Sequence, residues 1–251
     1  MAHNTSNIIF KPAEASMKTP EILFLDDALL VVCKPAGMLV QGDRTGDPTL
    51  LAQARDYLKR KFNSPDEVYL GLVHRLDRPT SGVTVFARTS KAAAHLSAQF
   101  HNRTARKTYW ALVEGKVPAK GNWVDEIVRM GVTSRVVKRG GEGQEAKLYF
   151  RCLGYRNDIS WVEIEPYTGR HHQIRVQFAY RGHPVVGDLR YGAEAKFGQK
   201  ALALHARALT ITHPTPETEM TFTAEPEHHW PKYFREASGR YNLNKRFLHN
   251  R

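Results

Sequence analysis

The chain has 251 residues, enough for one large domain or two small ones, and its 41% hydrophobic and 25% charged residues are ordinary for a globular protein. Its two cysteines, Cys33 and Cys152, exclude a disulfide framework and favour the reducing cytoplasm, and no apolar run reaches the ~18 residues of a membrane span. The 37 basic against 25 acidic residues, a net charge of +12, predict a polyanionic partner, and nucleic acid is favoured over a membrane surface because no long basic amphipathic helix is present.

The N-terminal segment 1–19 is polar and lacks the apolar core of a signal peptide, so we expect a disordered arm. The remainder, 20–251, contains no interdomain linker and is predicted to be a single domain. Two short apolar runs within 22–33 predict a β-hairpin. Apolar residues at helical spacing predict a helix over 50–62, with Thr49 as its N-cap.

The segment 74–82 (HRLDRPTSG) crowds one carboxylate, two arginines, a histidine and two hydroxyls into a short stretch. Apolar residues precede it and an alternating run follows it, which predicts a strand, a polar turn at Asp77 and a second strand. Arg75 and Arg78 flank the carboxylate and favour its ionised form. On this evidence Asp77 is either a nucleophile or the anchor of a salt bridge.

The remaining elements follow one another irregularly. A helix is predicted over 90–103 with Ser90 as its N-cap, and a strand over 107–114. Residues 115–146 are rich in Gly, Lys and Arg, which indicates a mobile basic hairpin or loop, either a solvated turn or a contact with nucleic acid. The last predicted elements are two strands within 149–166, a helix over 171–181 ended by Gly182, and a strand, or a short helix leading into a strand, over 201–212. Many strands with scattered helices argue for an α+β fold.

Two polar clusters, 169–175 and 182–188, lie in the C-terminal half. Arg175 falls inside the predicted helix next to the apolar Ile174, so partial burial is expected. A buried arginine needs an anion, either a carboxylate such as Asp77 or a phosphate group. A plain surface arginine is the alternative.

Motifs for metals and cofactors are missing from the sequence. The chain has 12 histidines but no HExxH, no Cys/His set with zinc spacing and no calcium loop. Neither GxGxxG nor GxxxxGK[ST] occurs, and Ser81 lacks the GxSxG context of a serine hydrolase. We therefore expect no metal ion and no cofactor.

The segment 74–82 resembles the signature of the RluA family of RNA pseudouridine synthases. Five further segments resemble that family's motifs in the same order, and the resemblance covers roughly residues 21–230. These segments are 34–40 (KPAGMLV), 106–115 (RKTYWALVEG), 169–177 (GRHHQIRVQ), 183–188 (HPVVGD) and 202–206 (LALHA). Six matches in the family's order argue against chance.

The resemblance implies the pseudouridine synthase fold, a mostly antiparallel mixed β-sheet with flanking helices and loops around a central catalytic cleft. Asp77 matches the catalytic aspartate, and Arg175 matches the arginine that pairs with it. Tyr109 matches a tyrosine that stacks on the target base and is a candidate base toward the ribose. The implied substrate-binding residues are Arg75, Arg78, Arg170, Ile174, Leu204 and His74. Of these, Arg78 matches a position proposed to enter the RNA helix and help to eject the uridine, while His74 is expected to shape the loop.

The implied reaction is the isomerisation of uridine to pseudouridine in structured RNA. It breaks the N-glycosidic bond, rotates the uracil and rejoins it through carbon 5, and because nothing is oxidised it requires no cofactor. An ionised carboxylate such as Asp77 acts at the ribose, as a nucleophile or by assisting proton removal, after the base has left its stack. We expect a cytoplasmic monomer that acts on ribosomal or transfer RNA and has no DNA or membrane partner.

Larger members of the family carry an additional N-terminal RNA-binding domain. Only about twenty residues precede the first predicted hairpin, so we expect that domain to be absent and substrate choice to lie in the catalytic domain, including the basic segment 133–147. A non-catalytic RNA-binding or RNA-folding protein on the same scaffold is the main alternative, against which the set Asp77, Tyr109 and Arg175 argues. A nuclease would lack a metal cluster and a histidine-based acid–base pair.

Overall fold

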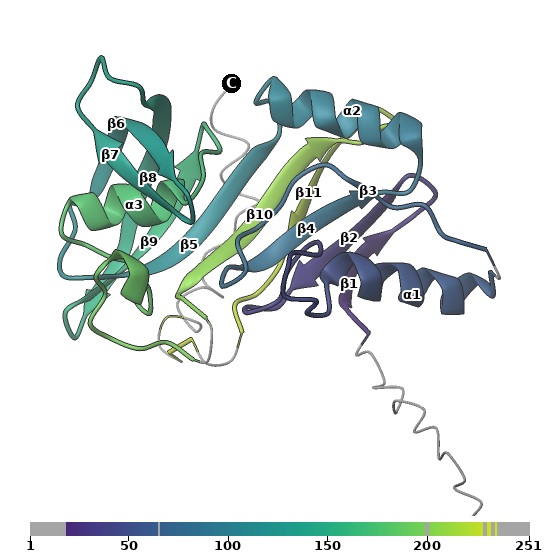
Figure 1. Ribbon diagram of the computed structural model, residues 1–251, viewed down its shortest axis with the longest axis horizontal. Helices are drawn as coiled ribbons and strands as arrows, with labels where there is room; N and C mark the ends of the chain where they lie inside the picture. The colour runs from purple at the N-terminus through teal and green to yellow at the C-terminus, as the bar shows by residue number, and fades with distance from the viewer. Residues whose placement is uncertain (1–18, 65, 199–200, 228–229, 232–233, 235–251) are drawn as a thin grey trace, which may run out of the picture.

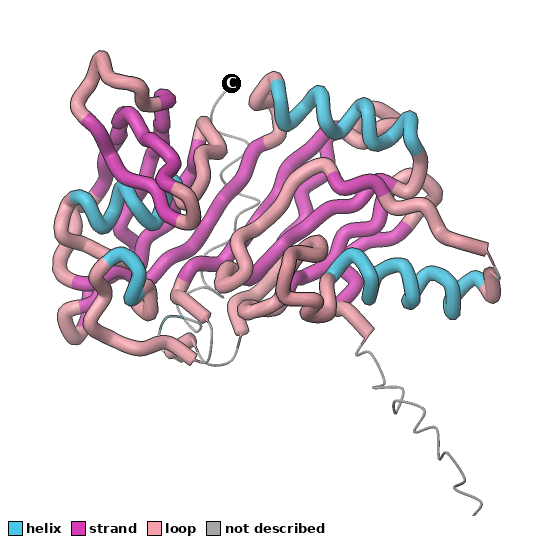
Figure 2. Tube along the Cα trace, viewed as in Figure 1, coloured by secondary structure: helices cyan, strands magenta, loops and turns pink. Residues whose placement is uncertain are grey.

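A computed structural model describes residues 19–64, 66–198, 201–227, 230–231 and 234. The disordered arm expected over 1–19 therefore lies outside the described residues, apart from Thr19. Within the described part of the chain, the strands form one eleven-stranded sheet with helices packed against it (Figure 1). Figure 2 separates these helices from the strands and from the loops that join them.

The described residues form eleven strands, three α-helices and one 3₁₀ turn. The strands are β1 (Glu21–Leu25), β2 (Leu29–Lys34), β3 (Gly71–Leu72), β4 (Ser81–Ala87), β5 (Arg106–Glu114), β6 (Lys120–Met130), β7 (Thr133–Val137), β8 (Gln144–Arg156), β9 (Ile159–Pro166), β10 (Leu204–Thr212) and β11 (Glu219–Thr223). The helices are α1 (Leu50–Phe62), α2 (Ser90–His101) and α3 (Gln173–Tyr180), with a short 3₁₀ turn, η1 (Leu189–Tyr191).

The sheet order is β1-β2-β4-β10-β5-β9-β8-β6-β7, with β3 also paired to β4 and β11 to β10. The pairing of β4 with β10 is parallel and the other pairings in this sheet are antiparallel. The expected α+β class and the mixed, mostly antiparallel sheet are confirmed. The parallel pair divides the sheet into a first half, with β1 to β4, and a second half, with β5 to β9.

The first half is covered on both faces. Leu30 and Val32 of β2 pack in one apolar cluster with α1, whereas Leu29 and Val31 pack in another with α2. Because neighbouring residues of a strand point to opposite faces, the two helices lie on opposite sides of the sheet. β2 and β4 are accordingly buried along their whole length, which makes this half a rigid base for the loop that precedes β4.

Local capping explains where the two helices of the first half begin. α1 has the predicted bounds, and the Thr49 hydroxyl accepts a backbone N–H three residues further on, at 3.2 Å. The sequence predicted Ser90 as the N-cap of α2, but the N-cap is Thr89. Thr89 has the extended backbone of a cap and its hydroxyl accepts from the third helical N–H at 3.1 Å, while Ser90 is already helical. The helix ends at His101, two residues before the predicted Arg103.

The second half agrees with its prediction in one place and differs from it in another. The segment 115–146, for which a basic hairpin or loop was expected, contains the regular hairpin of β6 and β7, paired from Glu126 with Val137 to Met130 with Thr133. Its strands are mostly exposed or half-buried, so they lack the alternating pattern by which strands are recognised. Helix α3 begins at Gln173 rather than at residue 171, because His172 has the left-handed backbone conformation, φ 57°.

Gly82 brings the two halves together. It pairs with Ala206 in the parallel ladder of β4 and β10, and its φ is +115°. A Cβ atom at this position would lie 2.3 Å from the backbone oxygen of Ala206. Only glycine therefore permits this approach of the strands, which sets the loop 74–80 against β10 and β5. Among the described residues, no helix is both long and apolar enough to cross a membrane.

Candidate active site

A pocket of about 640 Å³ lies at the joint between the two halves. The loop before β4, strand β5, the turn that leads into α3, and the start of β10 supply its walls. Eight of the nine residues that the sequence singled out line it: His74, Arg75, Asp77, Tyr109, Arg170, Ile174, Arg175 and Leu204. The pocket thus collects side chains that are up to 130 positions apart in the sequence.

Backbone contacts fix the turn that carries Asp77. The Thr80 N–H donates to the Asp77 carbonyl at 3.0 Å, which closes the turn. The next carbonyl, that of Arg78, accepts from the Gly37 N–H at 2.9 Å and from the Lys34 ammonium at 3.0 Å. The Asp77 side chain remains 32% exposed. The carboxylate is therefore held in place by its backbone while its side chain stays accessible from the pocket.

Lys34 is fully buried and its ammonium contacts the backbone of the Asp77 turn. Its ammonium donates to the carbonyls of Pro35, Met38 and Arg78 at 2.8 to 3.0 Å. Burial lowers the pKa of Lys34 from 10.5 to about 7, although the negative charge of Asp77 opposes the shift. The side chain joins the loop after β2 to the loop before β4.

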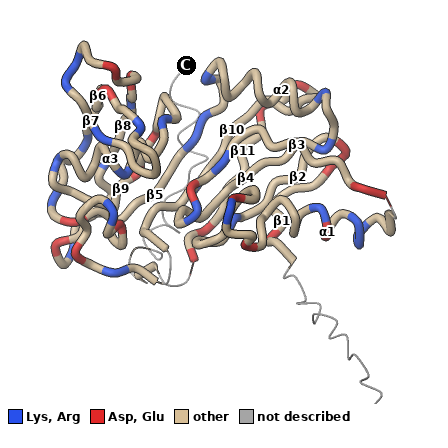
Figure 3. The backbone as a smooth tube through the Cα atoms, in the orientation of Figure 1, with Lys and Arg blue, Asp and Glu red and all other residues tan. Residues whose placement is uncertain are grey.

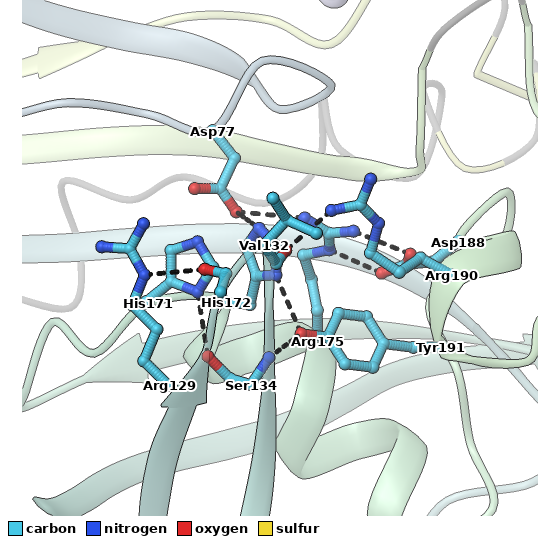
Figure 4. A network of polar contacts seen from close by, with 11 residues as sticks. Asp77, Arg129, Val132, Ser134, His171, His172, Arg175, Asp188, Arg190 and Tyr191 are labelled. Atoms are coloured by element: carbon cyan, nitrogen blue, oxygen red, sulfur yellow. Dashed lines mark hydrogen bonds and ion pairs between the residues drawn. The ribbon is translucent and has the colours of Figure 1, made fainter.

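Arg175 faces two carboxylates (Figure 4). Its Nε and Nη2 donate to Asp188 at 2.6 and 2.9 Å, and its Nη1 donates to Oδ2 of Asp77 at 3.3 Å. Burial alone would lower the pKa of Arg175, but the two carboxylates outweigh it and raise that pKa above its usual value. Arg175 is thus a permanent cation whose two-pronged bond with Asp188 aims its third nitrogen at Asp77.

A second group approaches Asp77 beside Arg175. The Nε2 atom of His172 lies 3.6 Å from Oδ2 of Asp77, and its Nδ1 atom lies 2.8 Å from the hydroxyl of Tyr191. The backbone N–H of Ser134, on β7, donates to that hydroxyl at 2.8 Å. Figure 4 shows this chain running from the β6–β7 hairpin through Tyr191 and His172 to the carboxylate.

Tyr109 lies half-buried on the pocket wall, on strand β5. Burial and the negative charge of Asp77 raise the pKa of its phenol above the usual value. The phenol therefore keeps its proton at neutral pH and is a poor general base. Its ring is available for stacking on a base that enters the pocket.

His74 contributes to the shape of the loop. The backbone N–H of Val85 donates to its Nε2 at 3.0 Å, and its ring stacks on Phe100 with centroids 4.7 Å apart. Burial lowers the pKa of His74 to about 3, and the neighbouring Lys107 adds to this. A neutral histidine tied to β4 in this way orients the segment before Asp77.

Arg78 is the one predicted site residue that does not line the pocket. Its Nε donates to the Gly37 carbonyl at 3.0 Å, and its guanidinium forms an ion pair with Asp47. The two arginines of the segment 74–82 therefore have different contacts. Arg75 lines the pocket, whereas Arg78 links the Asp77 turn to the loop after β2. Figure 3 shows the basic residues distributed over both halves.

A family model described as RNA pseudouridylate synthase matches residues 28–180, which include Asp77, Tyr109 and Arg175. The chain belongs to the RNA pseudouridylate synthase family. Among its relatives, ribosomal large subunit pseudouridine synthase C of Vibrio cholerae serotype O1 is 36% identical over 214 residues, 83% of this chain and 66% of the relative. The tRNA pseudouridine synthase C of Haemophilus ducreyi is 32% identical over 235 residues, 85% of this chain and 94% of the relative.

Solved structures of the pseudouridylate synthase family share the fold. Human RNA pseudouridylate synthase domain containing 4 superimposes with a TM-score of 0.70 at 27% identity, covering 88% of this chain and 92% of that one. Human RNA pseudouridylate synthase domain containing 1 gives a TM-score of 0.68 at 28% identity, with 84% and 85% covered. The expected pseudouridine synthase fold is therefore confirmed. The chain spans about two thirds of the length of the Vibrio ribosomal relatives, 66% and 64% of two of them.

Sequence reasoning about this pseudouridylate synthase family member missed three residues that shape the site. Asp188, His172 and Tyr191 received no role, although all three lie in or near the polar clusters 169–175 and 182–188. Arg175 and Asp77 are 98 positions apart in the sequence, whereas Arg175 and Asp188 are only 13 positions apart. A short Arg–Asp separation across a glycine turn was the available signal. In the described residues, no group of three or more His, Cys, Asp or Glu side chains is placed to hold a metal ion.

Proposed function

We propose that the protein is an RNA pseudouridine synthase that isomerises one or more uridines in structured ribosomal or transfer RNA. The observation that supports this most directly is the placement of Asp77 in the pocket, beside the buried pair of Arg175 and Asp188. The relatives named above act, by their names, on ribosomal and on transfer RNA. Both kinds of RNA therefore belong to the proposal.

Each residue of the pocket has its own role in the proposed reaction. The pocket volume of about 640 Å³ is in the range that accommodates one flipped nucleotide. Asp77 acts on the ribose, the bond from C1′ to N1 breaks, the uracil turns, and a bond from C1′ to C5 forms while the C5 proton leaves to solvent and N1 gains one. Tyr109 stacks on the base, and Ile174 and Leu204 form apolar walls. The chemistry uses no redox step and leaves the atom count of the RNA unchanged.

The charge of the chain supports the same substrate. Arg75, Arg103, Lys107 and Arg170 all line the pocket. Lysine and arginine side chains around an opening of this kind bind the phosphates that flank an extruded nucleotide. We place substrate binding on Arg75, Arg170 and His74, and assign Arg78 to the support of the Asp77 turn. A single catalytic domain over 20–251, acting as a cytoplasmic monomer, completes the proposal.

The experiment that tests the proposed function uses release of tritium from [5-³H]uridine-labelled total RNA taken from cells that lack the protein. The wild-type chain should release tritium to water, and Asp77→Asn should release none while still binding the RNA. Asp27→Asn, in the turn between β1 and β2, is the matched control and should behave as the wild type. Release by Asp77→Asn at the wild-type rate would overturn the proposal; a wild-type protein that binds RNA but releases nothing would favour the non-catalytic alternative.

A further inference from the structure

The contacts of the Tyr191 hydroxyl favour one tautomer of His172. The Ser134 backbone N–H can only donate, so the hydroxyl oxygen accepts that bond, at 2.8 Å. The single hydroxyl proton of Tyr191 is then free to point at Nδ1 of His172, also 2.8 Å away. A nitrogen that accepts a hydrogen bond bears no proton in a neutral imidazole, which leaves the proton on Nε2.

His172 is neutral under this arrangement. Its side chain is only 8% exposed, and burial lowers its pKa to about 4. The positive charges of Arg175 and Arg190 and the neighbouring His171 add to the lowering, and the negative charge of Asp77 opposes it. At neutral pH the ring therefore presents an uncharged Nε2–H group toward the carboxylate.

The ring has little freedom to turn away. His171 stacks on it with centroids 3.8 Å apart and an interplanar angle of 24°, and Nδ1 of His171 lies 2.9 Å from the Ser134 hydroxyl. The backbone of His172 has the left-handed conformation, φ 57°, which is costly for a residue with a Cβ atom. A strained residue of this kind persists where its surroundings determine its position, and such positions cluster at functional sites.

We propose that His172 is a positioning residue, whose Nε2–H donates to Oδ2 of Asp77 during the reaction and whose tautomer is set by Tyr191 and the Ser134 backbone. The inference rests on the proposed function. The separation of 3.6 Å between Nε2 and Oδ2 exceeds a hydrogen bond, and such contacts commonly tighten when a substrate binds. Arg175 approaches the same oxygen, Oδ2, so the two donors hold one carboxylate oxygen and direct Oδ1 to the ribose.

The first test compares two substitutions of His172 in the tritium assay. His172→Phe keeps the ring and removes the donor, and it should lower the turnover at saturating RNA by about 10- to 100-fold, the range for a hydrogen bond to a charged group, with unchanged RNA affinity. His172→Gln places an amide N–H near the position of Nε2 and should recover most of this loss. Turnover of His172→Phe near the wild type, or His172→Gln as slow as His172→Phe with intact thermal unfolding, would overturn the proposal.

The second test isolates the tautomer with a double-mutant cycle. Tyr191→Phe removes the hydroxyl proton donor and should slow turnover by about 2- to 10-fold, the range for a neutral hydrogen bond. In the His172→Gln background, which has no tautomer to set, Tyr191→Phe should cost nothing further. Equal losses in both backgrounds would show that Tyr191 acts elsewhere. Tyr155→Phe, which removes a hydroxyl bond to Asp158 on the β8–β9 turn, is the matched control and should leave turnover unchanged.

A measurement without substrate separates this inference from the proposed function. In the full chain labelled with ¹⁵N-histidine, the resonances of His172 should show a protonated Nε2 and an unprotonated Nδ1 at pH 7, and Tyr191→Phe should shift the balance toward the other tautomer. A proton on Nδ1 in the wild type would overturn the inference while leaving the role of Asp77 intact. If the wild type releases no tritium at all, the proposed function fails, whichever tautomer is seen.

Discussion

The two halves of the sheet hold their parts of the site by different means. The first half presents Asp77 on a turn fixed by backbone carbonyls and N–H groups and by the glycine contact at Gly82. The second half presents Arg175 and His172, which are held by the side chains of Asp188 and Tyr191. The comparison indicates that the first half determines where the carboxylate lies and the second half supplies the side chains that contact it. Substitutions of the groups that hold the Asp77 turn in the first half should act mainly on folding, and conservative substitutions of the groups that contact Asp77 from the second half should act mainly on turnover.

The largest effect is expected from Arg175, which links both carboxylates. Arg175→Ala leaves the buried Asp188 without its partner and should cost about 3–5 kcal/mol of stability, with turnover falling on the order of a thousandfold. Arg175→Lys keeps the charge but cannot form the two-pronged bond, so it should fold better and still turn over slowly. Arg181→Lys at the C-cap of α3, where Arg181 binds Asp125 with two nitrogens, is the control. Tritium release and thermal unfolding are measured for all three variants. Wild-type turnover in Arg175→Lys would contradict the prediction that the contacts made from the second half control turnover.

Asp188→Asn should have the next largest effect. The amide keeps the shape of the side chain but removes the charge that orients Arg175, so turnover should fall by about 10- to 100-fold while RNA affinity is retained. Single-turnover tritium release measured with saturating enzyme separates the chemical step from binding. A raised RNA dissociation constant with unchanged single-turnover rate would move Asp188 from the reaction to substrate binding.

A smaller effect, specific to the first half, is expected from the titration of Lys34. Its folded-state pKa of about 7 lies below the usual 10.5, so the unfolded chain binds more protons between these pH values and stability rises with pH in that window. Lys34→Met lacks this titration. The difference in free energy of unfolding between wild type and Lys34→Met, from urea denaturation, should therefore shift in favour of the wild type from pH 7 to pH 9.5. A difference that stays constant would mean that Lys34 keeps its ordinary pKa in the folded state.

The smallest effects concern the two arginines of the loop 74–82. Arg75→Ala should weaken RNA binding severalfold and reduce the slope of log affinity against log salt by about one, because one phosphate contact is lost. Arg78→Ala should leave that slope nearly unchanged and lower thermal stability, because Arg78 binds the Gly37 carbonyl and Asp47. Filter binding at several salt concentrations measures both. A larger change of slope for Arg78→Ala would restore Arg78 to the RNA-contacting role that the family resemblance implied.

Local sequence was sufficient wherever local forces decide the structure. Helix α1 has its predicted bounds because Thr49 caps it and its apolar spacing is regular. The Asp77 turn and strand β5 with Tyr109 follow from patterns within a few residues. The grouping of Asp77, Tyr109 and Arg175 around one pocket was expected from the family resemblance, and the described residues have that arrangement.

The remaining features depend on contacts between distant segments. The left-handed conformation of His172 delays the start of α3, and position 172 itself is not a glycine or asparagine, which would have signalled this conformation. The hairpin of β6 and β7 lies partly exposed, so its residues show no apolar period. The pairing of Asp188 with Arg175 requires the turn 187–188 to fold back on α3, which periodicity does not reveal.

The contact between Ser134 and Tyr191 is made by a backbone N–H. Every amino acid except proline supplies the same group, so the sequence of the β6–β7 hairpin can diverge without loss of this link. The exposed side chains of the hairpin can therefore change while the contact of His172 with Asp77 is retained. Proline at position 134 should break this link, because it has no backbone N–H.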